Sequence, residues 1–240
     1  NAGTAITTGS NNTALGSDAM YQGVVTGSYN IAVGSSALRY VSSGASNVAI
    51  GVNSLESNTT ASNNTAVGMS SLAANTTGNY NVALGATALD VNTTANYNVA
   101  IGYASLGANT TGGENTAVGG YALLTNVTGE ANVGIGYASL RTNVASSNTA
   151  MGYESMRLNT SGANNTAIGR AALYTNTTGA ENVSVGKNSL LANTTGSNNV
   201  AIGVEAMDAN TTGATNVGIG KSALGSNTTG TRNIALGPYA

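Results

Sequence analysis

Few side chains in this sequence could carry out chemistry. It contains no His and no Cys, so the most common general base, the thiol nucleophile and the usual zinc ligands are missing. The nine carboxylates are scattered, and the closest pair in the repeat pattern is Glu114 and Glu130. Two neighbouring carboxylates can hydrolyse a glycosidic bond, but two solvated turn residues explain this pair more simply. We therefore predict no catalytic residue, no cofactor and no metal site, and hence a protein that is not an enzyme.

Tyrosine is the only aromatic residue type, and some tyrosines could form a binding surface. An outward tyrosine can pack on a sugar ring, although scattered tyrosines on a repetitive protein are more often ordinary surface residues. The candidate contacts for a cell-surface glycan or a host receptor are Tyr80, Tyr97, Tyr103, Tyr137 and Tyr153.

Threonine and asparagine suggest two further activities. Adjacent threonines such as Thr76 and Thr77 recur, and regular threonine arrays are typical of ice-binding solenoids. Those solenoids place alternate threonines on a strand, whereas these are adjacent, lie in a turn and are interrupted at Val127. The sequence Asn75-Thr76-Thr77 also matches the acceptor pattern for an N-linked glycan. We expect these asparagines to be unmodified in a bacterial or phage protein, and glycosylated only if the protein passes through a eukaryotic secretory pathway.

One repeat generates all these features. We number it from an Asn, position 0, which opens the pattern N-x-A-x-G, with Gly or Ser sometimes in place of Ala. Successive Asn residues are 17 residues apart, except for one spacing of 18 and one of 16. A period this short is typical of one coil of a β-solenoid. The fourteen starts are Asn12, Asn30, Asn47, Asn64, Asn81, Asn98, Asn115, Asn132, Asn148, Asn165, Asn182, Asn199, Asn216 and Asn233.

The repeat has a constant pattern of residue types. Position 1 is Val, Ile or Thr, position 2 is tiny, position 3 is aliphatic, position 4 is Gly, position 7 is Ala or Ser, and position 8 is Leu or Met. The alternation predicts a short strand, with positions 1 and 3 facing an aliphatic core and positions 0, 2 and 4 facing away from it. We expect the Gly to bend the chain, a second extended piece at positions 7 and 8, and NTTG to close the coil. The Asn of position 0 should form a stacked amide ladder.

The length changes and the charges support this arrangement. Both length changes fall in the turn segment, where insertions and deletions are tolerated. Arg141 and Arg157 share position 9 of neighbouring coils, and Arg170 and Lys187 share position 5. Stacked coils would place each pair roughly 4.8 Å apart, which like charges tolerate only in water. Positions 5 and 9 should therefore point outward.

A single chain has too few large apolar residues to be stable alone. Ordering the backbone costs roughly 1–2 kcal/mol per residue, whereas burying a Leu or Ile returns about 1.5–3 kcal/mol. Two or three such residues in a coil of 17 do not offset that cost. The column of small residues at position 2 then suggests close contact with another backbone. We predict that identical chains pack side by side, most simply as a homotrimer.

Composition limits the other partners. Charged residues make up 7% of the chain and the formal net charge is −2, so no basic surface predicts binding to nucleic acid. No apolar run approaches the roughly 18 residues that span a bilayer, so we expect no membrane insertion in this segment.

The motif N-[VTI]-A-[ILV]-G-x-x-[AS]-[LM] resembles the head repeats of trimeric autotransporter adhesins. The longer form with NTTG is similar to repeats of bacterial and phage tail-fibre proteins. The resemblance covers residues 12–240 and implies a left-handed parallel β-roll that trimerises. Two features differ from the adhesin heads: the period is longer by about one NTTG turn, and Asn replaces the usual Ser at position 0.

These observations lead to one set of expectations. The fold is all-β, a parallel β-solenoid or β-roll of 17-residue coils, forming a homotrimeric fibre. Residues 1–11 are the end of a preceding coil, and residues 12–240 are a single array of fourteen coils within a longer fibre. The function is that of a non-enzymatic structural or adhesive fibre segment, extracellular, at a bacterial cell surface or on a phage virion. The alternative is a monomeric ice-binding or carbohydrate-binding solenoid.

Overall fold

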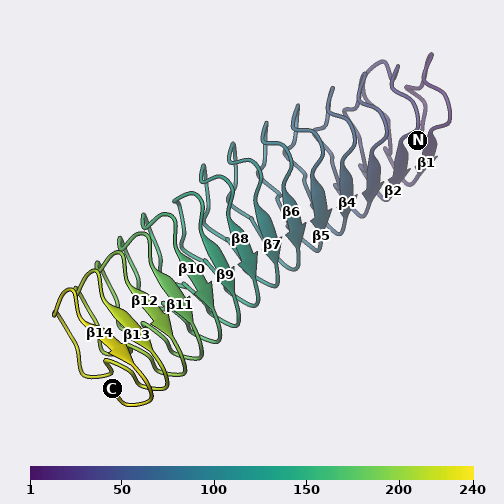
Figure 1. The fold of residues 1–240 in the computed structure, drawn as a ribbon. Helices are drawn as coiled ribbons and strands as arrows, with labels where there is room; N and C mark the ends of the chain where they lie inside the picture. The colour runs from purple at the N-terminus through teal and green to yellow at the C-terminus, as the bar shows by residue number, and fades with distance from the viewer. The chain divides into compact units, whose positions relative to one another are not determined.

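The computed structural model describes residues 1–240 and shows an all-β chain with no helix. Contacts divide it into two compact units, Asn1–Asn115 and Thr116–Ala240. Each unit is a parallel β-solenoid in which every coil contributes one three-residue strand, at positions 1 to 3 of the repeat (Figure 1). The expected all-β parallel β-solenoid of 17-residue coils is therefore confirmed.

The strands of each unit pair in parallel with the strands of the neighbouring coils. The first unit contains β1 (Thr13–Leu15), β2 (Ile31–Val33), β3 (Val48–Ile50), β4 (Thr65–Val67), β5 (Val82–Leu84) and β6 (Val99–Ile101). The second contains β7 (Thr116–Val118), β8 (Val133–Ile135), β9 (Thr149–Met151), β10 (Thr166–Ile168), β11 (Val183–Val185), β12 (Val200–Ile202), β13 (Val217–Ile219) and β14 (Ile234–Leu236).

The register places equivalent repeat positions beside one another. Ala49 of β3 pairs with Ala66 of β4, and the register is unchanged beside the long first coil, where Ala14 pairs with Ala32. In the short coil the turn closes one residue early, yet Gly134 of β8 still pairs with Ala150 of β9. The prediction that the turn absorbs both length changes is confirmed.

The first residues of the chain bond to the first coil. The amide of Thr7 donates to the carbonyl of Val25 at 3.1 Å, and Ile6 forms an isolated parallel bridge with the same residue. The amide of Gly3 donates to the carbonyl of Ala19 at 2.9 Å. Residues 1–11 thus lie against the coil that follows them.

The interior of each coil is narrow and is filled from positions 2, 7 and 8. The position-8 side chains, for example Leu55 and Leu190, are fully buried, as are the position-2 alanines such as Ala201. A Cβ built on Gly134, at position 2, would lie 3.3 Å from Cγ of Leu123, at position 8 of the preceding coil. Position 2 is small because the space between the strand and the Leu column holds no more than a methyl group.

The expected direction of the strand faces is wrong. Positions 1 and 3 point away from the coil interior: Ile50 is 40% exposed and Ile202 is 38% exposed, whereas Ala201 between its two aliphatic neighbours is fully buried. The alternation itself was predicted correctly, but the small side is the inner side. The physical reason is the narrow interior, which the Leu column already fills.

The segment at positions 5 to 10 is also different from the expectation. It contains no strand and runs as a series of turns. The Leu or Met of position 8 has a positive φ, between 48° and 53°, in every coil that contains one. The residue at position 6 also has a positive φ, as at Asn53 and Asn188, both at 57°. Such left-handed residues turn the chain, and burial of the Leu side chains offsets the backbone strain.

The Gly at position 4 is required by two constraints. Gly136 has a φ of 124°, a conformation that other residues rarely adopt. A Cβ on it would also lie 2.5 Å from the carbonyl oxygen of Gly152, the same position in the next coil. The predicted bend at this column is confirmed.

Two ladders of buried asparagines connect the coils: the first is present in both units from the first coil, and the second begins at Asn58 in the third coil. In the position-0 ladder, Nδ2 of Asn182 donates to Oδ1 of Asn165 at 3.1 Å. In a second ladder at position 11, Nδ2 of Asn193 donates to Oδ1 of Asn176 at 2.9 Å. Asn182 and Asn193 also both donate to the carbonyl of Gly196, each at 2.9 Å, which clamps the two ends of the turn together. The first ladder was predicted, whereas the sequence suggested only a turn for the second.

Replacing one asparagine of the first ladder should be far more damaging than replacing its neighbour. Asn199→Ala removes bonds to Asn182 and Gly213, and leaves the amide of Asn216 without its acceptor. Each buried polar group left unsatisfied costs about 1–3 kcal/mol. We expect a loss of about 3 kcal/mol in the free energy of unfolding, measured by urea denaturation.

The control is the adjacent, exposed Asn198. Asn198 immediately precedes the ladder residue. In another coil, Ala131 occupies the same position as Asn198 with a similar φ of 54°, so alanine is compatible with this position. Asn198→Ala should cost less than about 1 kcal/mol, as is usual for a surface substitution. Equal losses for the two variants would show that the ladder does not stabilise the coils.

Two glycines of one coil should respond differently to a methyl group. Gly136→Ala meets the positive φ and the carbonyl of Gly152, so we expect a loss of more than about 2 kcal/mol. Gly134→Ala places a methyl group where most coils already have Ala, and should change stability by less than about 1 kcal/mol. Thermal denaturation monitored by circular dichroism compares the two, and a similar fall in Tm for both would contradict the role given to position 4.

Candidate functional site

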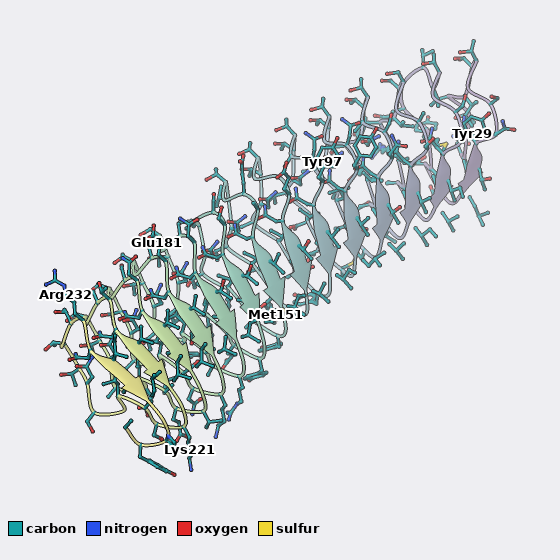
Figure 2. All side chains as sticks on the ribbon, in the orientation of Figure 1. Tyr29, Tyr97, Met151, Glu181, Lys221 and Arg232 are labelled. Carbon is teal, nitrogen blue, oxygen red and sulfur yellow. The ribbon has the colours of Figure 1, made fainter.

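The most extensive exposed feature is the outer side of the strands. In each unit, we call the surface made of the first and third residues of its strands the strand face. It contains only Val, Ile, Leu, Thr and one Met, with no charged residue in any coil. Its third-position side chains are substantially exposed, as at Ile50, Ile168 and Ile219, and Met151 lies on the strand side of its coil (Figure 2). Large exposed apolar patches of this kind mark interaction sites in soluble proteins.

Four of the five candidate tyrosines form two stacked pairs, one in each unit. Tyr80 and Tyr97 stack with ring centroids 5.1 Å apart and planes within 2°. Tyr137 and Tyr153 stack at 5.5 Å with planes 16° apart. Tyr103 is exposed in the first unit. All five lie at the surface, which fits the sequence analysis, and the pairing arises because residues 17 or 16 positions apart become neighbours on successive coils.

The pair in the second unit is part of a larger group that includes residues not singled out in the sequence. Tyr121 packs edge-on against Tyr137 at 5.8 Å, and the guanidinium of Arg141 lies over the Tyr121 ring at 5.7 Å. Because Tyr121 occupies position 6 and its partners positions 5 and 9, the contact depends on how the turn curves. The repeat alone offered no signal for it.

Arg157 is held by two neighbours on the same side of the coils. Its Nη1 donates to Oε1 of Glu154 at 2.8 Å and to the hydroxyl of Tyr174 at 3.0 Å. Burial acts to lower the pKa of Arg157, but the hydrogen bond with Tyr174 and the charge of Glu154 outweigh it and raise the pKa above its ordinary value. This guanidinium therefore stays charged at every physiological pH.

Positions 5 and 9 point outward, as predicted, but to different extents. Arg170 and Lys187 at position 5 are exposed, whereas Arg141 and Arg157 at position 9 are half-buried. No carboxylate lies within 4 Å of the charged nitrogens of Arg141, Arg170 or Lys187, since the salt bridges of the chain are Arg39 with Glu56 and Arg157 with Glu154.

Two further groups with possible chemistry are the acidic pair and the threonines of the turn. Glu114 and Glu130 fall in different units. No group of three or more acidic residues is arranged to hold a metal ion. The position-12 hydroxyls are engaged in the coil, since Oγ1 of Thr76 donates to the carbonyl of Thr93 at 3.1 Å, whereas Thr77 is exposed. The chain contains no helix that is long and apolar enough to cross a membrane.

The glycan acceptor sequences divide into two structural classes. Asn75 and Asn193 belong to the position-11 ladder, are fully buried and donate to the carbonyls of Gly78 and Gly196, so their amides are inaccessible in the folded protein. Asn63, which also precedes x-Thr, is exposed. The idea that every turn could be decorated is therefore incompatible with this fold.

This difference can be measured after secretion from a glycosylating host. Folded molecules should carry glycan at the exposed acceptors Asn63 and Asn164 and none at Asn75 or Asn193, because a modified ladder amide could not donate its hydrogen bonds. Glycopeptide mass spectrometry of the folded fraction gives the occupancy of each site. A glycan on Asn75 in folded molecules would contradict the ladder geometry.

Comparison with known proteins does not identify the chain. No protein-family model matches it, and neither the curated proteins nor the solved structures contain a match.

Proposed function

We propose that this chain is a segment of a non-enzymatic, structural and adhesive extracellular fibre. In this proposal three copies associate through their strand faces into a homotrimer. The fibre belongs to a bacterial cell surface or to a phage tail, consistent with the resemblance of the repeat to adhesin heads and tail-fibre proteins. The observation that carries the proposal is the uncharged, aliphatic strand face.

The strand face fits another copy of the same surface better than an unrelated partner. Its side chains recur once per coil, so a partner that contacts every coil must have the same spacing between its own contact residues. A second copy of this chain has that spacing because it has the same repeat. Interface cores are depleted in charge, and the strand face has no charged residue to desolvate. Burial of its aliphatic side chains, which a single chain leaves about 40% exposed at Ile50 and Ile168, stabilises the assembly.

The internal hydrogen bonding suits a load-bearing role. Backbone bonds between strands and the position-0 asparagine ladder connect each coil to the next, and the second ladder adds a further connection from the third coil onward. Extending one coil from its neighbour would break all these bonds together. The outward positions, by contrast, vary freely without disturbing the ladders.

The alternative is a monomeric solenoid that binds ice. Thr occupies the first position of five strands, and the strand face exposes two ranks of mostly β-branched side chains. A monomer would present this surface to water, whereas an oligomer would cover it. Thermal hysteresis by a monomeric chain would favour this alternative.

Sedimentation equilibrium tests the proposal directly. The isolated chain should have the mass of a trimer, and Ile202→Lys should weaken association by at least about tenfold, because it places a charge within an apolar interface. Val204→Lys is the matched control, because Val204 is exposed at position 5, where Lys187 and Lys221 stand in neighbouring coils. A monomeric wild-type chain, or equal effects of the two substitutions, would overturn the proposal.

A further inference from the structure

The cations of this protein are concentrated on one side of the second unit. Five of the seven Lys and Arg residues occupy positions 5 and 9 between residues 141 and 221. In the first unit, position 5 is Ser, Val, Met, Ala or Tyr and is never charged. We call the side chains of Tyr137, Arg141, Tyr153, Arg157, Arg170 and Lys187 the basic edge.

The charge of the basic edge is mostly uncompensated. Glu154 pairs with Arg157, but no carboxylate lies within 4 Å of Arg141, Arg170 or Lys187. Arg170 and Lys187 occupy the same position of adjacent coils, so they lie roughly 4.8 Å apart before their side chains diverge. Two cations this close repel each other by about 1 kcal/mol even in water. An anionic partner would relieve that repulsion.

The neighbouring tyrosines extend this column without a break. Tyr137, Tyr153, Arg170 and Lys187 occupy position 5 of four consecutive coils, and all four are exposed. A partner lying along the column would meet two phenol hydroxyls and then two cations, at intervals of one coil. This spacing fits a linear polymer rather than a compact ligand.

The aromatic geometry favours a polymer of sugars over a nucleic acid. Bases bind proteins by stacking on free aromatic faces. Here Tyr137 packs face to face with Tyr153 and at a right angle with Tyr121, so its ring is engaged within the protein. The hydroxyls, which donate and accept hydrogen bonds, suit a ligand rich in hydroxyl groups. The net charge of −2 also opposes association with nucleic acid away from this edge.

We propose that the basic edge binds a linear polysaccharide that bears carboxylates, with Arg170 and Lys187 pairing with its anions and Tyr137 and Tyr153 hydrogen-bonding to its hydroxyls. The inference rests on the proposed adhesive function, for which it names the class of receptor. It does not depend on the trimer interface, because position 5 lies outside the strand face, beyond the Gly bend.

The test compares binding of a defined probe to matched variants by isothermal titration calorimetry. The probe is an oligogalacturonate, with one carboxylate per sugar, and its methyl ester is the uncharged control. Arg170→Ser combined with Lys187→Ser should weaken binding by about 100-fold, since each charge-assisted contact contributes about tenfold. Serine is compatible with position 5, where Ser17 and Ser35 stand.

A control variant removes a cation from elsewhere. Arg232 lies on the side of the coils opposite to Lys221, whose side chain projects from the position-5 column (Figure 2). Arg232→Ser should leave the affinity unchanged. Serine is compatible with this position, since Ser46 occupies it in another coil. Tyr137→Phe with Tyr153→Phe retains the stacked rings and should weaken binding about fivefold through loss of the hydroxyls.

The outcomes separate this inference from the proposed function. Loss of binding in the double serine variant, with the same mass as the wild type in sedimentation, would support it. Equal binding by wild type and the double serine variant, or equal binding of the acid and its ester, would overturn it whatever the oligomeric state. Tighter binding of a single-stranded oligothymidylate with the same number of charges would also overturn it, in favour of a nucleic-acid surface.

Discussion

The sharing of one backbone carbonyl by two buried asparagines closes every coil that has Asn at position 11, which the first two coils lack. The carbonyl of position 14 accepts a hydrogen bond from the amide of position 0 and another from the amide of position 11, as at Gly196 and Gly213. Each amide also donates to the equivalent asparagine of the preceding coil, Asn182 to Asn165 and Asn193 to Asn176, so closure of a coil and stacking of coils use the same side chains. Because these groups are fully buried, each must keep all its partners for the structure to be stable.

The ladders explain why the rest of the interior is so simple. Once two columns of amides occupy part of the cross-section, the remaining volume admits one column of Leu or Met and two columns of Ala or Ser. Larger residues are excluded from position 2 by the Leu of the preceding coil, as the 3.3 Å approach at Gly134 shows. The aliphatic side chains at positions 1 and 3 therefore have no room inside and remain on the surface.

This arrangement separates the positions that are the same in nearly every coil from the positions that differ between coils. The columns that face inward are nearly invariant along the chain, whereas positions 5, 6 and 9 accept Tyr, Arg, Lys, Glu or Ser. Residues far apart in sequence thereby become neighbours on one side of the coils, as Tyr121, Tyr137 and Tyr153 do. A surface of this kind can gain a binding function by substitution without any change of the scaffold, which supports the adhesive role proposed for it.

The sequence by itself determined the period, the parallel stacking, the bend at position 4 and the first asparagine ladder, because each depends only on residue types that recur at fixed spacing. For Asn75 and its equivalents the sequence predicts only turn residues, because NTTG is also a common turn sequence. Tertiary structure alone decided which side of the strand faces inward. An alternating pattern along a strand shows that it has two faces but not which face points into the coil. The inner face is decided by the volume that the Leu side chains of position 8 leave free. It also decided the contacts around Tyr121 and Arg157, since these depend on the curvature imposed by left-handed residues at positions 6 and 8.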